Sequence, residues 1–213
     1  MPHPVSFPQN HPHPVHPKPI VIGHWITAAL LALAFGLVLS REWIDDKTVR
    51  TLLLQGHRMA GLLIGSLAIL RLALRSRLAL ARPLAALPLW QRWMSRLVQA
   101  LMYALLVSLP LLGWLLTNAR GQPVSLPLLG NLPLLTPRDL DLADTVELVH
   151  TWAAWSLLVL IALHGAAAAW HHHIRRDGVL AAMWPGLRAK ATPPSGTTAF
   201  SSTELRMKDQ PCR

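Results

Sequence analysis

Two histidines stand fourteen residues apart within one long apolar stretch of this chain. The stretch is VHTWAAWSLLVLIALHGAAAAWHHH, residues 149–173, and it contains His150 and His164. In an α-helix, fourteen residues rise about 21 Å and complete nearly four turns, so the two imidazoles share one helix face to within about 40°. An imidazole deep in an apolar segment is costly without a partner, and imidazole nitrogens are common metal ligands. The spacing therefore indicates two histidine sites at different depths along one helix.

Four long apolar segments would position these histidines, at about residues 20–40, 53–74, 97–118 and 146–170. Each is close to the roughly 20 residues that a helix needs to cross a bilayer. The chain of 213 residues is 52% hydrophobic and only 14% charged, whereas a soluble domain has about 25% charged residues. We therefore predict an all-α fold, a transmembrane four-helix bundle.

The charged residues predict how this bundle is oriented. The stretch 71–96, from the end of the second segment to the start of the third, carries six arginines and no acid, and further basic residues follow the fourth segment. The six are Arg71, Arg75, Arg77, Arg82, Arg92 and Arg96. The other two connections carry the acids Glu42, Asp45, Asp46, Asp139, Asp141, Asp144 and Glu147. The positive-inside rule then places both termini in the cytoplasm and the acidic connections outside. This topology explains the net charge of +10, so no nucleic-acid partner is expected.

Two more histidines lie in the N-terminal half, at depths that match the first two. His24 is near the cytoplasmic start of the first segment, and His57 is near the outer start of the second. The expected pairs are His24 with His164 and His57 with His150. Two such pairs on facing helices would bind two b-type haems, because each iron takes two axial nitrogens. A proton relay or a transition-metal site remains an alternative, although no carboxylate lies deep inside a segment to complete either.

Small residues surround these histidines. They are Gly23, Gly56, Gly61, Gly65, Gly165 and the alanines 166–169. Small side chains allow either a flat macrocycle or a neighbouring helix to approach the backbone closely. The sequence leaves both interpretations open.

The sequence divides into three parts. Residues 1–19 are rich in proline and are expected to be disordered, residues 20–185 form the four-helix cytochrome domain, and residues 186–213 form a flexible tail. The proline- and leucine-rich connection 119–145 is expected to hold a short helix near its end. The single cysteine, Cys212, excludes a disulfide framework or a thiolate-bound iron–sulfur cluster within this chain.

Four motifs carry a resemblance to a known family: GHW, GHRMAG, YALLVSLPLLGWLLTNARG and LVHTWAAWSLLVLIALHGAAAAWHHH. Over roughly residues 18–185 the chain resembles the bacterial cytochrome b561 family, small four-helix membrane cytochromes with two haems. The resemblance assigns the axial ligands to His24, His57, His150 and His164. Some members have extra histidines at the start of the third span, where residues 95–99 of this chain have none.

The resemblance also implies a function, which is electron exchange with quinone in the bacterial inner membrane. The members that look most similar are superoxide oxidases, which oxidise superoxide at the outer face and reduce ubiquinone. Arg58, adjacent to His57, is expected to attract the superoxide anion or to pair with a haem propionate. Further candidates for attracting superoxide are Arg41, Arg50, Arg120 and Arg138.

The ubiquinone site is expected near the cytoplasmic haem, with membrane lipid around it. His171 would handle protons there, since imidazole titrates near neutral pH, and Trp170 would lie beside it. Ser40 or Gln55, at the outer side, is the alternative.

Two other functions compete with superoxide oxidation. The chain could be the electron-transfer subunit of a hydrogenase or another dehydrogenase, in which case a redox partner protein would replace superoxide. It could also be a haem-free transporter or structural membrane protein.

Overall fold

The computed structural model describes residues 17–77, 88–126, 130–175, 180 and 183–184. Four α-helices dominate it, namely α1 (Lys18–Ser40), α2 (Lys47–Arg77), α3 (Leu89–Ala119) and α4 (Leu140–Trp170). Each is long and apolar enough to cross a membrane, since about 20 residues suffice. The expected disordered start and flexible tail lie almost wholly outside the described residues. The all-α architecture predicted from the sequence is confirmed.

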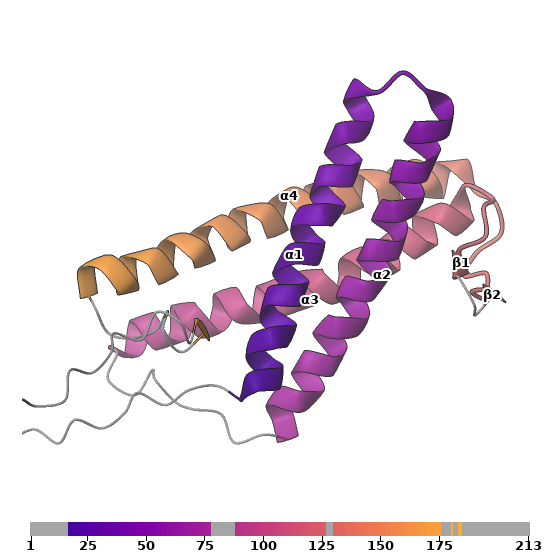
Figure 1. The fold of residues 1–213 in the computed structure, drawn as a ribbon. Helices are drawn as coiled ribbons and strands as arrows, with labels where there is room; N and C mark the ends of the chain where they lie inside the picture. Colours follow the sequence, from indigo (N-terminus) through magenta and orange to yellow (C-terminus); the bar gives the residue numbers. More distant parts are fainter. Residues whose placement is uncertain (1–16, 78–87, 127–129, 176–179, 181–182, 185–213) are drawn as a thin grey trace, which may run out of the picture.

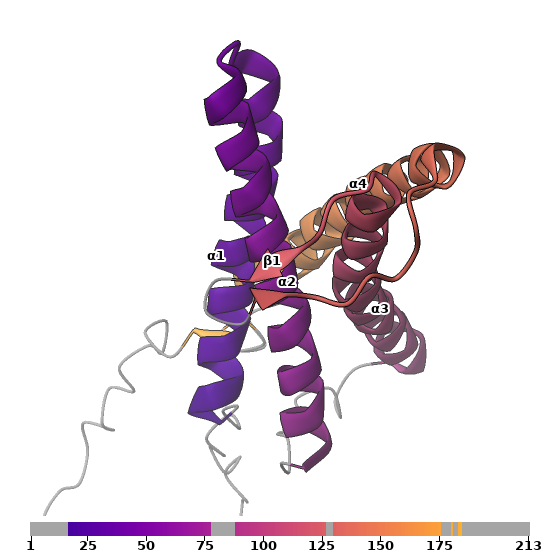
Figure 2. The same cartoon turned by 90° about the vertical axis from the view of Figure 1, so that its right-hand side faces the viewer.

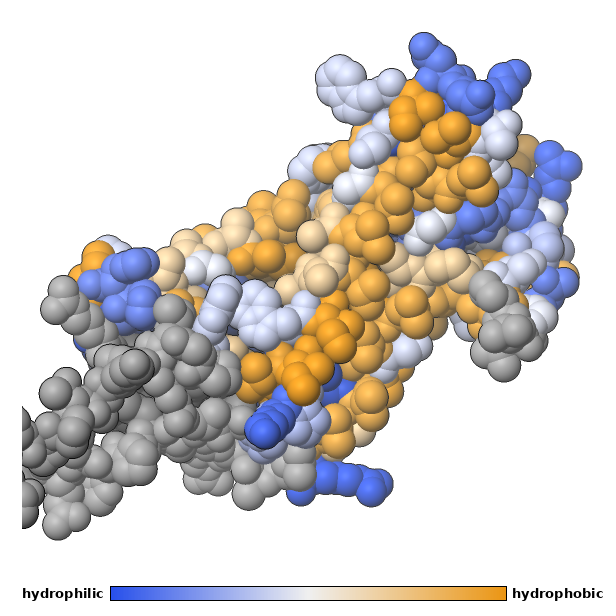
Figure 3. Space-filling model, viewed as in Figure 1, coloured by the Kyte–Doolittle hydropathy of each residue, from blue (hydrophilic) through white to orange (hydrophobic). Residues whose placement is uncertain are grey.

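The helices form two antiparallel hairpins, α1 with α2 and α3 with α4. The hairpins cross each other, and α2 packs against α3 where they meet (Figures 1 and 2). Apolar side chains cover the helix shafts, and hydrophilic side chains gather toward the helix ends (Figure 3). This distribution is the one expected of helices that face lipid along their length.

Local sequence explains where the helices begin. The side chain of Asp46 accepts hydrogen bonds from the backbone N–H of Thr48 and Val49 at the start of α2, and Asp139 accepts one from Leu142 at the start of α4. Such caps satisfy N–H groups that have no partner inside the helix. Two of the acids counted as outer charges therefore have a structural role as well. Helix α1 begins at Lys18, two residues before the predicted start, because a proline is tolerated in the first helical turn.

The core lies where the two hairpins cross. Its buried residues are Ala34, Ala60, Ile64, Ala68, Leu106, Leu109 and Leu157. A Cβ added at Gly65 of α2 would lie 3.0 Å from Cγ of Pro110 in α3, so this glycine sets how closely the two helices approach. Gly56 has a similar role, since a Cβ there would lie 3.1 Å from Leu37 Cδ1.

The connection between α3 and α4 differs from the expectation of a short helix. Helix α4 extends back to Leu140, and the connection instead contains the antiparallel strands β1 (Ser125–Leu126) and β2 (Gly130–Asn131). Buried Asn118 organises it, donating to the carbonyl of Gln122 and accepting from the N–H of Leu135. The strand pairing and the side-chain amide of Asn118 provide hydrogen-bond partners for backbone groups of this connection.

Candidate haem sites between facing helices

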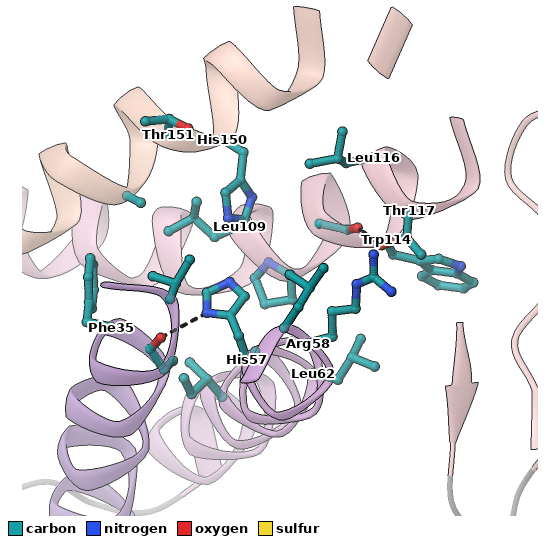
Figure 4. Close-up of a pocket in the computed structure, with 18 of the residues that line it drawn as sticks. Phe35, His57, Arg58, Leu62, Leu109, Trp114, Leu116, Thr117, His150 and Thr151 are labelled. Carbon is teal, nitrogen blue, oxygen red and sulfur yellow. Dashed lines mark hydrogen bonds between the residues drawn. The ribbon is translucent and has the colours of Figure 1, made fainter. Parts of the chain in front are cut away.

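His57 of α2 and His150 of α4 face each other across a cavity between the two hairpins (Figure 4). Their ring centres are 6.3 Å apart, and the ring planes make an angle of 74°. A metal held by two imidazole nitrogens at about 2 Å each would leave the ring centres roughly 6 Å apart. The pair is therefore spaced as two axial ligands of one iron would be.

The backbone of α1 fixes which nitrogen of His57 is available. Nδ1 of His57 lies 2.9 Å from the carbonyl oxygen of Ala34. Since a carbonyl only accepts, Nδ1 carries the proton and donates it, and Nε2 keeps its lone pair for a metal. Histidine ligands of metals commonly have such an outer hydrogen bond. No sequence pattern indicated that Ala34 has this role.

His150 packs against the backbone of α3. A Cβ added at Gly113 would lie 3.6 Å from Cε1 of the His150 ring and 3.9 Å from Nδ1. Nδ1 of His150 is buried without a hydrogen bond of ordinary geometry, and the backbone of Leu109 lies near it. Gly113 thus gives the ring room to stand between α3 and the cavity, a role that the sequence analysis missed.

The cavity has a volume of about 320 Å³ and is lined by all four helices. Most of its wall is apolar, including Phe35, Leu62 and Leu116 (Figure 4). Gly61 also lines it, and a Cβ there would meet no atom within 4 Å. Of the two interpretations of the glycines, Gly61 therefore fits space for a cofactor, whereas Gly65 fits close helix packing.

Three arginines reach the wall of this cavity, Arg41, Arg58 and Arg120, together with the acids Glu42 and Glu147. Arg58 Nη2 donates to Oε1 of Gln122 at 2.9 Å. Arg120 forms an ion pair with Glu147, and Nε of Arg41 is buried without a partner. Three of the five arginines expected at this site are thus brought together.

The other two arginines are not at the cavity. Arg50 is absent from its lining, because it lies two turns before His57 at the exposed start of α2. The aliphatic part of Arg138 packs against Gly121, where a Cβ would lie 3.2 Å from Arg138 Cδ. Any attraction that these two arginines exert on an anion would therefore act from outside the cavity lining.

The second pair is at the opposite end of the helices. The rings of His24 in α1 and His164 in α4 have centres 6.3 Å apart and make an angle of 68°. Nη2 of Arg71, in α2, lies 3.4 Å from Nδ1 of His24. The sequence analysis counted Arg71 among the charges of the connection that follows α2, whereas the structure places it beside this histidine pair.

The chain after α4 returns to this second pair. Trp25 Nε1 donates to the carbonyl oxygen of Met183 at 3.0 Å. The Trp25 ring also makes edge contacts with Trp184 and with His24. This contact joins residues about 160 positions apart in the chain, and no local pattern predicted it.

None of the residues expected at either quinone site lines the cavity. His171 begins a π-helical turn, His171–Arg175, seven residues and about 10 Å along the axis from His164. Trp170, just before it, is largely exposed. Ser40 and Gln55 are exposed and do not line the cavity.

The donor set of both pairs fits a haem better than a bare metal ion. Within the described residues, no group of three or more His, Cys, Asp or Glu side chains could hold a metal ion. Two imidazoles per site with an apolar cavity between helices suit an iron whose other four ligands come from a porphyrin. The site geometry and the membrane-type helices are thus those expected of a membrane cytochrome of the b type.

Comparison with known proteins agrees with that class. A family model described as prokaryotic cytochrome b561 matches residues 15–186. Cytochrome b561 homolog 1 of Escherichia coli K12 is 30% identical over 164 residues, which cover 76% of this chain and 92% of the relative. Cytochrome b561 homolog 2 of the same organism is 27% identical over 75% of this chain and 86% of the relative. The chain belongs to the prokaryotic cytochrome b561 family, whose members transfer electrons in membranes with b-type haem.

A third relative is more specific in name but covers less of the chain. The probable superoxide oxidase CybB of Yersinia pestis is 32% identical over 87 residues, which cover 40% of this chain and 48% of the relative.

Proposed function

We propose that this chain binds two b-type haems and transfers electrons from superoxide to ubiquinone across the bacterial inner membrane. The observation that carries the proposal is the set of three arginines at the cavity of the His57–His150 pair. With Glu42 and Glu147 in the same lining, the five charges leave one net positive charge at an otherwise apolar cavity. A net positive rim attracts a small anion and raises its encounter rate. The partial likeness to a probable superoxide oxidase supports the same substrate.

The electrons and atoms balance as follows. Two superoxide anions each lose one electron and leave as dioxygen. One ubiquinone gains those two electrons with two protons and becomes ubiquinol. A bound b-type haem supplies one-electron oxidation and reduction. Two histidines would hold each haem, so the chain's own contribution to the reaction would be to bring superoxide to the cavity and to keep water out of it.

The residues of the chain have separate parts in this proposal. His57 and His150 would hold one haem, and His24 and His164 would hold the other. Arg41, Arg58 and Arg120 draw the anion to the cavity, and the apolar wall keeps bulk water away from it. His171, at the opposite end of α4, would transfer protons for ubiquinone, whose tail the surrounding lipid would accommodate.

The test uses the purified full chain in lipid nanodiscs. A pyridine haemochromogen assay measures haem per chain, and quinol formation is followed while an enzymatic source supplies superoxide. We expect two haems per chain and superoxide-dependent ubiquinol formation without another protein. Two haems without this activity, together with a co-purifying dehydrogenase, would instead favour the electron-transfer subunit. No haem, in a preparation made with haem available, would refute both.

A further inference from the structure

Arg71 is a charged residue well inside a membrane-type helix. It lies six residues before the end of α2, which corresponds to about 9 Å along the helix axis. It follows His57 by fourteen residues, the same interval that separates His150 from His164. Helix α2 therefore presents a histidine to one pair and an arginine to the other from nearly the same face.

The hydrogen-bond and ring contacts of Arg71 are with side chains that carry no negative charge. Its Nη2 lies 3.4 Å from Nδ1 of His24, and its Nη1 lies 3.5 Å from the hydroxyl of Thr27. Its guanidinium carbon lies 5.8 Å from the ring centre of Tyr103. Both hydrogen-bond distances are at the long end for such contacts, and Nε of Arg71 is buried without a partner.

Within the described part of the chain, no carboxylate pairs with Arg71. The ion pair found among those residues joins Arg120 and Glu147, near the other histidine pair. A cation inside a membrane protein is normally paired or lines a functional site, because an unpaired charge there is costly. Among the residues that the structure describes, Arg71 therefore lacks the anion that its position calls for.

The backbone of α1 accommodates this side chain specifically. A Cβ added at Gly23 would lie 3.2 Å from Cγ and 3.3 Å from Cδ of Arg71. Gly23 thus provides the room in which the aliphatic part of the arginine crosses α1. The guanidinium is held beside His24 by this packing, so its position is not that of a side chain extended into solvent.

Metal binding by His24 would remove one of the present contacts. A guanidinium only donates, so Nδ1 of His24 must accept in the contact with Arg71. When Nε2 of a histidine ligates a metal, its Nδ1 normally carries a proton and donates. Arg71 would then need a different acceptor beside the His24–His164 pair.

We propose that Arg71 binds an anionic oxygen group at the His24–His164 pair, and that this group is a propionate carboxylate of the haem held there. The inference rests on the proposed two-haem assignment. A carboxylate would satisfy Nε and Nη2 together in the two-pronged geometry that arginine favours. A phospholipid phosphate offers the same chemistry, so the experiment must separate the two sources.

The experiment measures haem content and redox potentials of purified Arg71→Gln, Arg71→Lys and the control Arg75→Gln. Arg75 lies one turn further along α2 and donates to Gln99 at 3.0 Å, so its loss removes the same charge without touching the pair. Removing a positive charge beside an iron favours the oxidised form. We expect Arg71→Gln to lower the midpoint potential of one haem by about 59 mV, a tenfold change in its reduced-to-oxidised ratio, or to lose that haem. Arg71→Lys should recover part of the shift, and Arg75→Gln should show none.

The outcomes separate the possible failures. Potentials and haem content of Arg71→Gln equal to wild type, with two haems in both, would overturn the role of Arg71 alone. One haem in the wild type would overturn the two-haem proposal on which it rests. A shift seen in phospholipid nanodiscs but absent in phospholipid-free maltoside detergent would assign the anion to lipid and refute the propionate. A shift that persists in the detergent supports it.

Discussion

The ion pair between Arg120 and Glu147 gives the sharpest test of how the cavity attracts its substrate. Glu147→Gln raises the net charge of the lining from one to two, and Arg120→Gln lowers it from one to zero, counting the five charged residues that line the cavity. One unit charge about 7 Å from an anion in water contributes about 0.6 kcal/mol. We therefore expect Glu147→Gln to raise the superoxide-dependent rate about threefold at low ionic strength and Arg120→Gln to lower it by the same factor.

The control is Asp141→Asn, which removes the same charge from an exposed acid of α4 that does not line the cavity. The assay is kcat/KM for superoxide at low salt and at physiological salt, with haem content measured for each variant. At physiological ionic strength the effect should fall by about half or more, because the screening length is about 8 Å. The reasoning is refuted if both variants change the rate in the same direction, or if Asp141→Asn matches Glu147→Gln.

Three further predictions concern the ligands, the packing and the proton path. His57→Ala should reduce haem from two to one per chain in the haemochromogen assay, and unchanged stoichiometry would show that the pair is misassigned. Gly65→Ala should lower the free energy of unfolding by about 1–2 kcal/mol, because the new methyl overlaps Pro110 of α3. In the control Gly36→Ala the new methyl has no atom within 4 Å, so the change should be neutral or stabilising by up to about 1 kcal/mol. Equal effects of the two substitutions would contradict the packing argument. His171→Ala should slow ubiquinol formation while leaving haem reduction by superoxide unchanged. In the control His173→Ala, whose side chain is exposed in the same turn, both rates should equal those of the wild type.

The positions of the histidines along their helices could be predicted from the sequence, because helix geometry depends only on local spacing. The fourteen-residue interval between His150 and His164 fixes their separation along α4 and their shared face before any packing is considered. The apolar segments likewise predicted four helices, and the structure lengthens them by caps such as Asp46 and Asp139. Pairing His57 with His150 needed only the order and direction of the helices.

The surroundings of the histidines depend on how the hairpins cross, and no local pattern contains that information. Ala34 accepts from His57 across 23 residues, and Gly113 meets His150 only because α3 and α4 pack at that height. In the sequence, Arg71 cannot be distinguished from the other basic residues of the stretch 71–96. Its contact with His24, 47 residues away, follows from the rotation of α2 against α1. The sequence by itself determined the histidines, their depths and the helices that bear them, whereas side-chain packing between helices decided which other groups surround each pair.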